Sequence, residues 1–207
     1  RLTRGARPET GNEAIKARRP DVLLYGNSGS ADEPYYLIGR NNRVTIADQD
    51  VLAAEGGFIP GTFVYPVWIV GANAKYYQTQ AGGKPTLVFN SPAYSPWLSY
   101  YHPESELRLA LAQPPVHGSG VWFSDFLWFK DQPEFLRLAE DYRFFSAHRR
   151  FYFHTTSRAR IAVVWGADSI NFYVPPQLKK TDHSQAGREG ETLGDILKEF
   201  HGVYDAL

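Results

Sequence analysis

Four short apolar runs in the chain each end on a single polar residue. The runs read LLYGN, VLAAE, LVFN and VWFSD, and they end at Asn27, Glu55, Asn90 and Asp125. These ends are separated by about 28, 35 and 35 residues, the length of a strand followed by a helix and its loops. The carboxyl ends of successive parallel strands meet at one end of an α/β fold. The pattern therefore predicts an α/β fold whose strand ends converge on one site.

Between these runs the sequence carries helix and turn signals, so that predicted strands and helices alternate along the chain. Pro20 ends a first helix, because the residue before a proline is biased away from helical backbone. Gly82 and Gly83 stop another helix, and Asp131 to Glu134 form a capping box that opens a long one. The predicted strands are 22–25, 48–55, 86–90, 120–125 and 160–166, and the predicted helices are 9–19, 68–80, 103–113, 133–150 and 193–207.

The composition argues against several kinds of protein. With 22 basic and 22 acidic residues the chain has no net charge, so there is no electrostatic case for a nucleic-acid or membrane-surface partner. There is no cysteine and the six histidines are scattered, so neither a metal site nor a disulfide is expected. No glycine-rich phosphate loop follows a strand, which argues against a nucleotide cofactor. We expect no cofactor of any kind.

The sequence leaves the cellular location open. No apolar run reaches the length of a membrane span, and no signal peptide is visible. The chain starts at Arg1 and contains no methionine, from which we expect a segment of a longer polypeptide. Cytoplasmic and secreted locations are both compatible with these observations.

The chain resembles a known family over roughly residues 20–207, most firmly over 105–207. The stretch HGSGVWFSDF is followed by a long helix, a linker and SRARIAVVWGADSINFY, and the chain then reaches an F-x-G-x-Y pattern at Phe200, Gly202 and Tyr204. This order is similar to the junction in β-galactosidase-like glycoside hydrolases of the family 42 type. The resemblance implies the C-terminal half of a (β/α)8 TIM-type barrel over residues 1–154. Residues 155–207 would then be the first strand and helix of a flavodoxin-like, class I glutamine amidotransferase-like trimerisation domain.

The resemblance also implies an activity, the hydrolysis of O-glycosidic bonds in an oligosaccharide or glycoside, and a homo-oligomer formed through the C-terminal domain. The four strands would be the fifth to eighth of the barrel, and the family's acid/base glutamate would belong to the half that precedes them. The family's nucleophilic glutamate corresponds to Asn90, where this chain departs from the pattern, because an amide cannot act as that nucleophile.

Two carboxylates are the candidate catalytic residues. Glu55 follows an apolar run and precedes Gly56 and Gly57, which let a backbone approach a ligand closely. Asp125 lies at the tip of the last strand, near Trp122. A glycosidase needs two such groups, one as proton donor and one as base or nucleophile. The alternatives are that Glu55 forms an ion pair with a nearby arginine and that Asp125 caps a turn.

The candidate substrate contacts are amide and aromatic side chains at the same predicted strand ends. Amides donate to and accept from sugar hydroxyls, and aromatic rings stack on the apolar faces of sugars. The amides can equally be turn residues, and the aromatic residues can equally cover the rim of the barrel. The candidates are Asn27, Asn90, Tyr94, Trp97 and Trp122.

Two other classes of protein remain alternatives. A non-catalytic carbohydrate-binding or scaffolding protein on the same barrel is favoured by Asn90 in the place of the nucleophile. A doubly wound α/β protein would instead have an open sheet with its strand ends meeting at one switch point.

Overall fold

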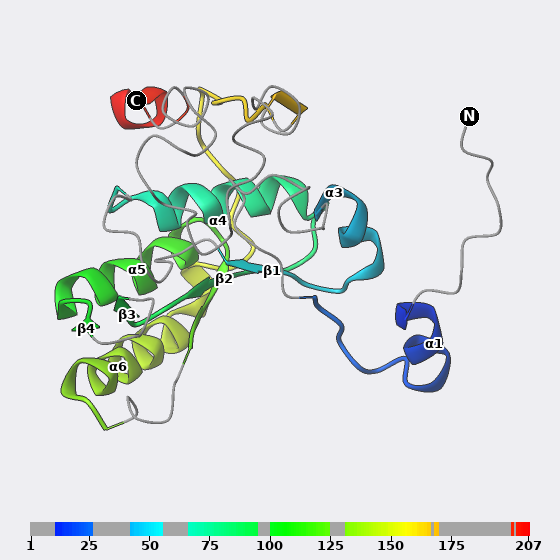
Figure 1. The fold of residues 1–207 in the computed structure, drawn as a ribbon, viewed down its shortest axis with the longest axis horizontal. Coiled ribbons are helices and arrows are strands. Elements are labelled where there is room, and N and C mark those ends of the chain that lie inside the picture. The colour runs from blue at the N-terminus through cyan, green and yellow to red at the C-terminus, as the bar shows by residue number, and fades with distance from the viewer. Residues whose placement is uncertain are drawn as a thin grey trace, which may run out of the picture.

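The computed structural model describes residues 11–26, 42–55, 66–94, 100–124, 131–166, 168–169, 200 and 202–207 (Figure 1). Three of the candidate site residues, Asn27, Trp97 and Asp125, lie outside these ranges. Tyr94 lies in strand β3 (Ala93–Tyr94), of which only the backbone is described.

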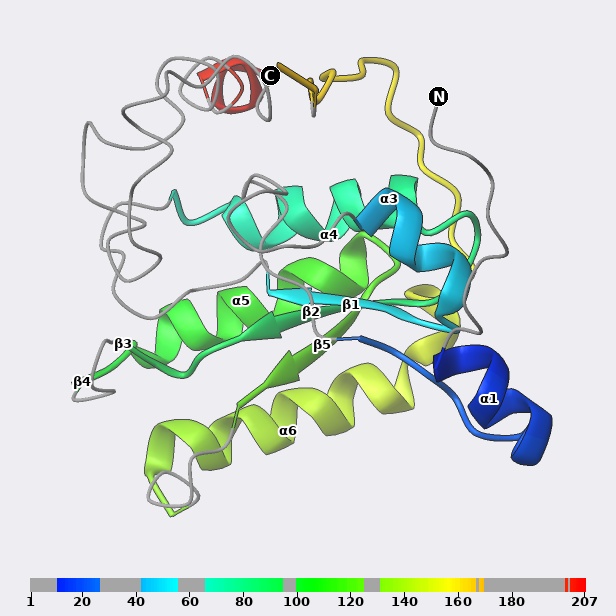
Figure 2. The ribbon, with the colours of Figure 1, turned by 45° about the vertical axis from the view of Figure 1, so that its right-hand side comes forward.

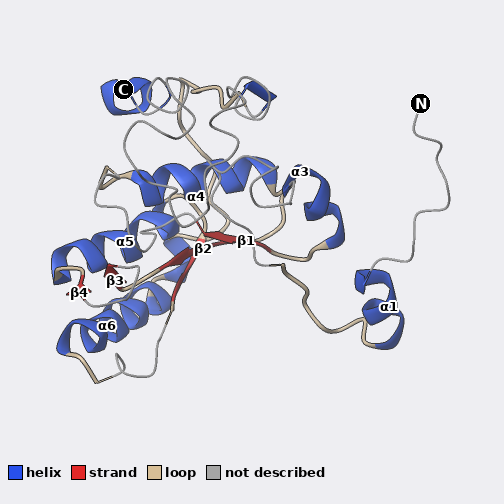
Figure 3. Ribbon diagram, in the orientation of Figure 1, coloured by secondary structure: helices blue, strands red, loops and turns tan. Residues whose placement is uncertain are grey.

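The fold is mixed α/β, as the alternation of apolar runs predicts. A parallel sheet, with its strands in red in Figure 3, contains β1 (Leu52–Glu55), β2 (Thr86–Asn90) and β5 (Gly120–Phe123) in that order. In its register Glu55 lies beside Phe89, and Phe89 lies beside Trp122. Helix α4 (Ile69–Gln80) connects β1 to β2, α5 (Glu104–Val116) leads from β2 to β5, and α6 (Pro133–Ala147) follows β5. The order is sequential along the chain, as expected when each helix crosses to the neighbouring strand.

Smaller elements flank these units. A two-stranded antiparallel ribbon of β3 and β4 (Tyr100–Tyr101) lies between β2 and α5. The others are α1 (Gly11–Arg18), α3 (Asn42–Thr45), and the 3₁₀ turns η1 (Ile46–Asp48) and η2 (Arg149–Phe151). No helix in the described part of the chain is long and apolar enough to cross a membrane.

The core lies between the sheet and helices α4 and α5. In β2 the buried side chains alternate with half-buried ones, so that Val88 faces the helices and Phe89 faces away from them. Burying a side chain of this kind stabilises the fold by about 1.5–3 kcal/mol relative to exposure. The core residues with no exposed surface are Leu52, Val70, Ala74, Tyr77, Val88, Leu107, Ala110 and Leu111.

The three long helices pack in a row. Helix α5 contacts both α4 and α6, and Figure 2 shows α4 and α5 on one side of the sheet with α6 next to them beyond β5. Leu138 of α6 is buried in the same core. At the surface Arg108 donates two hydrogen bonds, of 2.8 and 3.0 Å, to the Asp141 carboxylate. Each of the three helices therefore packs on a neighbouring helix, and α4 and α5 also pack on the sheet.

Helix α4 begins without a capping side chain of its own, because its N-cap residue is Trp68. Gln113 of α5 fills this role. Its Oε1 accepts the Gly71 N–H at 2.7 Å, and its Nε2 donates to the Val67 carbonyl at 2.7 Å. A Cβ atom at position 71 would lie 3.0 Å from both Gln113 Oε1 and His117 Nε2, so glycine allows the close approach.

Some helix ends lie where the sequence signals predict them, and others do not. Gly82 and Gly83 have φ values of 59° and 86°, and they stop α4 as predicted. The capping box predicted for α6 is wrong, because the N-cap is Gln132 and makes no side-chain cap bond. Helix α5 continues three residues beyond its predicted end at 113, through Pro114 and Pro115. Those prolines have no N–H group to donate to the helix. At the end of the helix the Pro114 carbonyl accepts hydrogen bonds from the backbone N–H groups of His117 and Ser119.

Two predicted strands are not formed. Residues 22–25 run beside the residues that precede β1. The Leu24 carbonyl accepts from the Asp50 and Val51 N–H groups at 2.7 and 3.4 Å, and the Leu24 N–H donates to the Asp50 carboxylate at 2.8 Å. Residues 160–166 pair with no strand in the described part of the chain, and Val164 is 85% exposed. An apolar run becomes a strand only where a neighbour accepts and donates its backbone hydrogen bonds.

Replacing Gln113 by Ala should lower the free energy of unfolding by about 1 kcal/mol, the usual cost of losing a helix N-cap. The measurement is urea unfolding followed by circular dichroism. Gln132→Ala is the matched control, because Gln132 is the N-cap of α6 and makes no side-chain cap bond. The control should change stability by less than about 0.5 kcal/mol. Equal losses in the two variants would contradict the role assigned to Gln113.

Candidate functional site

Three side chains form a row across the sheet near the carboxyl ends of its strands. Glu55, Phe89 and Trp122 are register partners in β1, β2 and β5. Register partners in parallel strands project to the same side of the sheet. This is the side away from the core, because Leu52, Val88 and Phe123, which have the opposite alternation, belong to the core cluster. We call Glu55, Phe89, Trp122 and the nearby Tyr25 the inner-face row.

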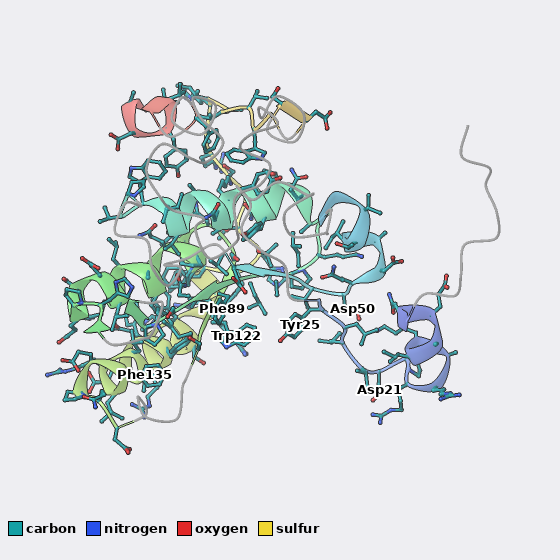
Figure 4. All side chains as sticks on the ribbon, viewed as in Figure 1. Asp21, Tyr25, Asp50, Phe89, Trp122 and Phe135 are labelled. Carbon is teal, nitrogen blue, oxygen red and sulfur yellow. The ribbon has the colours of Figure 1, made fainter. Side chains whose placement is uncertain are left out.

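The aromatic members of the inner-face row hold one another in place. The rings of Phe89 and Trp122 meet edge to face with centroids 5.0 Å apart, and Tyr25 meets Trp122 in the same way at 6.0 Å. Figure 4 shows the three rings together, on the side of the sheet away from α4. Trp122 remains 39% exposed and Tyr25 49% exposed. The row thus offers apolar ring surface to a ligand from rings that are already positioned by their neighbours.

The backbone at Glu55 is fixed from the opposite side of the sheet. The hydroxyl of Tyr77, which is fully buried in α4, donates to the Glu55 carbonyl at 2.8 Å. A hydrogen bond of this kind contributes about 1 kcal/mol. The Glu55 side chain is half-buried on the inner face. Helix α4 therefore holds the strand end that carries the carboxylate.

Gly120 shapes the middle of the inner face. A Cβ atom at this position would lie 2.4 Å from Cδ2 of Leu87, its register partner in β2. Because Gly120 has no side chain, the half-buried side chain of Leu87 occupies that space. Towards the amino ends of the strands the inner face is therefore apolar, and its carboxylate, Glu55, lies at the carboxyl ends.

The predicted site residues are brought together only in part. Glu55 and Trp122 lie on one face, separated by a single strand. Asn90 is fully buried and shares the alternation of Val88, so its side chain lies on the helix side of β2 and away from the inner-face row. Phe89 and Tyr25 were not among the predicted residues. The signal for Phe89 was available in LVFN, where it alternates with Val88 and Asn90.

A buried histidine lies behind the site, at the base of the β3–β4 ribbon. His102 is 3% exposed, and its backbone N–H donates to the Pro92 carbonyl at 3.0 Å. Its Nδ1 is 3.0 Å from Glu106 Oε2, one helical turn on. Burial lowers the pKa of His102 below its ordinary value, and the Glu106 carboxylate opposes this effect without overcoming it. The imidazole is therefore neutral at pH 7 and donates to Glu106 through Nδ1–H.

The described residues hold no cluster of three or more histidine, cysteine or acidic side chains that could bind a metal ion. The chemistry open to the inner-face row is that of a carboxylate beside aromatic rings. Such a row can accept hydrogen bonds from hydroxyl groups and can stack on the apolar face of a ring.

Comparison with known proteins gives no relative. No protein-family model, no curated protein and no solved structure matches the chain.

The lowered pKa of His102 predicts a pH dependence of stability. Because the folded protein binds this proton less tightly than the unfolded chain, the stabilising contribution of neutral His102 is complete above the unfolded pKa, near 6.5. It is lost as the pH falls from that value towards the folded pKa. His102→Gln should therefore flatten the fall in urea midpoint as the pH is lowered below about 6.5. An unchanged slope in the variant would contradict this assignment.

Proposed function

We propose that the protein is a glycoside hydrolase in which Glu55 is a catalytic carboxylate and the inner-face row binds the sugar. The single observation that carries this proposal is the row itself, a carboxylate in register with Phe89 and Trp122 at the carboxyl ends of parallel strands. In α/β barrels this end of the strands carries the catalytic residues. Asp125, two residues after β5, is the second carboxylate of the proposal.

We propose further that the sheet is part of a (β/α)8 barrel, as the resemblance to family 42 type enzymes implies. Two observations support this. The strand order is sequential and the helices pack in a row, whereas a doubly wound sheet reverses its order at a switch point. In addition, parallel sheets are normally covered on both faces, and the inner face bears the half-buried or exposed apolar side chains Leu87, Phe89 and Trp122. The interior of a barrel would cover them.

The amidotransferase-like domain over residues 155–207 stays a prediction. Its motif residues Phe200 and Tyr204 do make contacts in the described chain. Phe200 meets Trp165 edge to face at 4.6 Å, and Tyr204 lies 4.6 Å from the ring of Trp68 at the start of α4. These contacts place the end of the chain against the first α/β unit.

The alternative is a carbohydrate-binding protein without hydrolase activity. The observation that favours it is that Glu55 is the single carboxylate which the described strands place on the inner face, whereas hydrolysis needs two. In this case the aromatic rings would carry the affinity and Glu55 would accept hydrogen bonds from sugar hydroxyls.

Glu55→Gln tests the catalytic proposal, because it keeps the size of the side chain and removes its charge. With a panel of aryl glycosides we expect kcat to fall by at least about 100-fold, within the range for loss of an acid/base group. Glu140→Gln is the control, since Glu140 lies on α6 with 67% of its side chain exposed. Turnover that survives in Glu55→Gln would remove Glu55 from the mechanism.

Trp122→Ala tests sugar binding independently of turnover. Loss of a stacking ring should weaken binding of oligosaccharides about tenfold, which corresponds to about 1.4 kcal/mol. Trp122→Phe should recover part of the affinity. Calorimetric titration of the wild type and both variants separates the two functions. Binding without turnover supports the carbohydrate-binding alternative, and equal affinity in all three proteins would eliminate the inner-face row as the sugar site.

A further inference from the structure

The basic residues of this electrically neutral chain are unevenly placed. Residues 142–166 contain five arginines and neither aspartate nor glutamate, although the chain as a whole has equal numbers of basic and acidic residues. Four of these arginines lie within the twelve residues 149–160, which follow α6 and also contain two phenylalanines. We call this segment the arginine strip; it consists of Arg149, Arg150, Phe151, Phe153, Arg158 and Arg160.

Every side chain of the arginine strip is exposed. Phe151 is 59% exposed and Phe153 is 42% exposed. None of the four arginines forms an ion pair with a carboxylate within the described residues, whereas Arg19 and Arg108 each bind an aspartate at 2.8 Å. The strip therefore presents positive charge and ring surface to solvent.

The arginine strip is an irregular segment at the amino ends of the strands. It begins in η2, where the Arg149 carbonyl accepts from the Tyr152 and Phe153 N–H groups. Arg150 stacks on the Phe151 ring with its guanidinium carbon 4.6 Å from the centroid. The strip then passes Gly118, the turn into β5, which lies next to Thr155. The inner-face row lies at the opposite ends of these strands, so the two surfaces are separate.

The net charge of the whole chain predicts no nucleic-acid partner, but the local charge differs, and from it we propose that the arginine strip binds single-stranded nucleic acid. Arginine pairs with phosphate groups through two parallel hydrogen bonds. Exposed aromatic rings stack on unpaired bases, and stacked arginine adds a cation–π contribution. A chain of phosphates that carries unpaired planar bases matches both features, whereas a partner with charge alone would use the arginines and leave the aromatic rings unused.

Other anionic partners fit the arginine strip less well. A membrane surface is usually bound by an amphipathic helix with an apolar face, but the strip is a 3₁₀ turn followed by irregular chain. A duplex keeps its bases stacked on one another, which leaves the phenylalanines without a partner. A sulfated polysaccharide offers charge without planar bases.

The test is fluorescence anisotropy of labelled single-stranded oligonucleotides, with the whole protein titrated at several salt concentrations. Arg149→Ala with Arg150→Ala should weaken binding at low salt by at least about tenfold and make the slope of log K against log salt shallower by about 1.4. Phe151→Ala with Phe153→Ala should weaken binding by about fivefold or more without altering that slope. Arg137→Ala is the control, because this exposed arginine of α6 lies outside the strip.

Three results would overturn the proposal. The first is absence of oligonucleotide binding at low salt. The second is that heparin, a duplex of the same length or phosphatidylserine vesicles bind as tightly as the single strand. The third is that the phenylalanine variant binds as well as the wild type, since this would reduce the interaction to general attraction of a polyanion. Because all the substituted residues are exposed, unchanged circular dichroism should accompany each variant.

Discussion

The core and the inner-face row both depend on the alternation of side chains in the central strand, β2. Val88 and its neighbours of the same alternation pack against α4 and α5, so that Phe89 must project to the opposite side. The parallel register then places Glu55 and Trp122 beside Phe89. A shift of one residue in β2 would exchange the two faces, taking Phe89 into the core and Val88 out of it. The same constraint therefore forms the core and the inner-face row.

The sequence predicted most of the helices and strands, but it did not show which apolar runs have a neighbouring strand to pair with. Strand 86–90 and the helix before it are confirmed, because their signals are local: an apolar run, a paired glycine stop and lysine–proline between them. Residues 22–25 and 160–166 have equally apolar sequences, yet the described chain gives them no strand ladder. Whether a run becomes a strand depends on a neighbour that is distant in the sequence, and no local pattern encodes that neighbour.

The candidate site, like the fold, was predictable from the sequence only in part. The pattern of polar residues at strand ends predicts Glu55 and the aromatic run predicts Trp122, and both side chains lie on one face of the sheet. The position of each residue after an apolar run does not say which face it occupies, and so Asn90 was grouped with Glu55 although it lies on the helix side. Phe89 could have been found by counting alternation from Val88. Tyr25 could not, because its place beside Trp122 comes from packing between segments distant in sequence.

The cap that Gln113 provides for α4 links the folding of two successive α/β units. Its two hydrogen bonds join groups 42 and 46 residues apart, so the first turn of α4 is complete only after the last turns of α5 have formed beside it. A first unit on its own would begin its helix with unsatisfied amides. The two units consequently form one cooperative block, in which fraying of the end of α5 exposes the Gly71 amide to exchange with solvent.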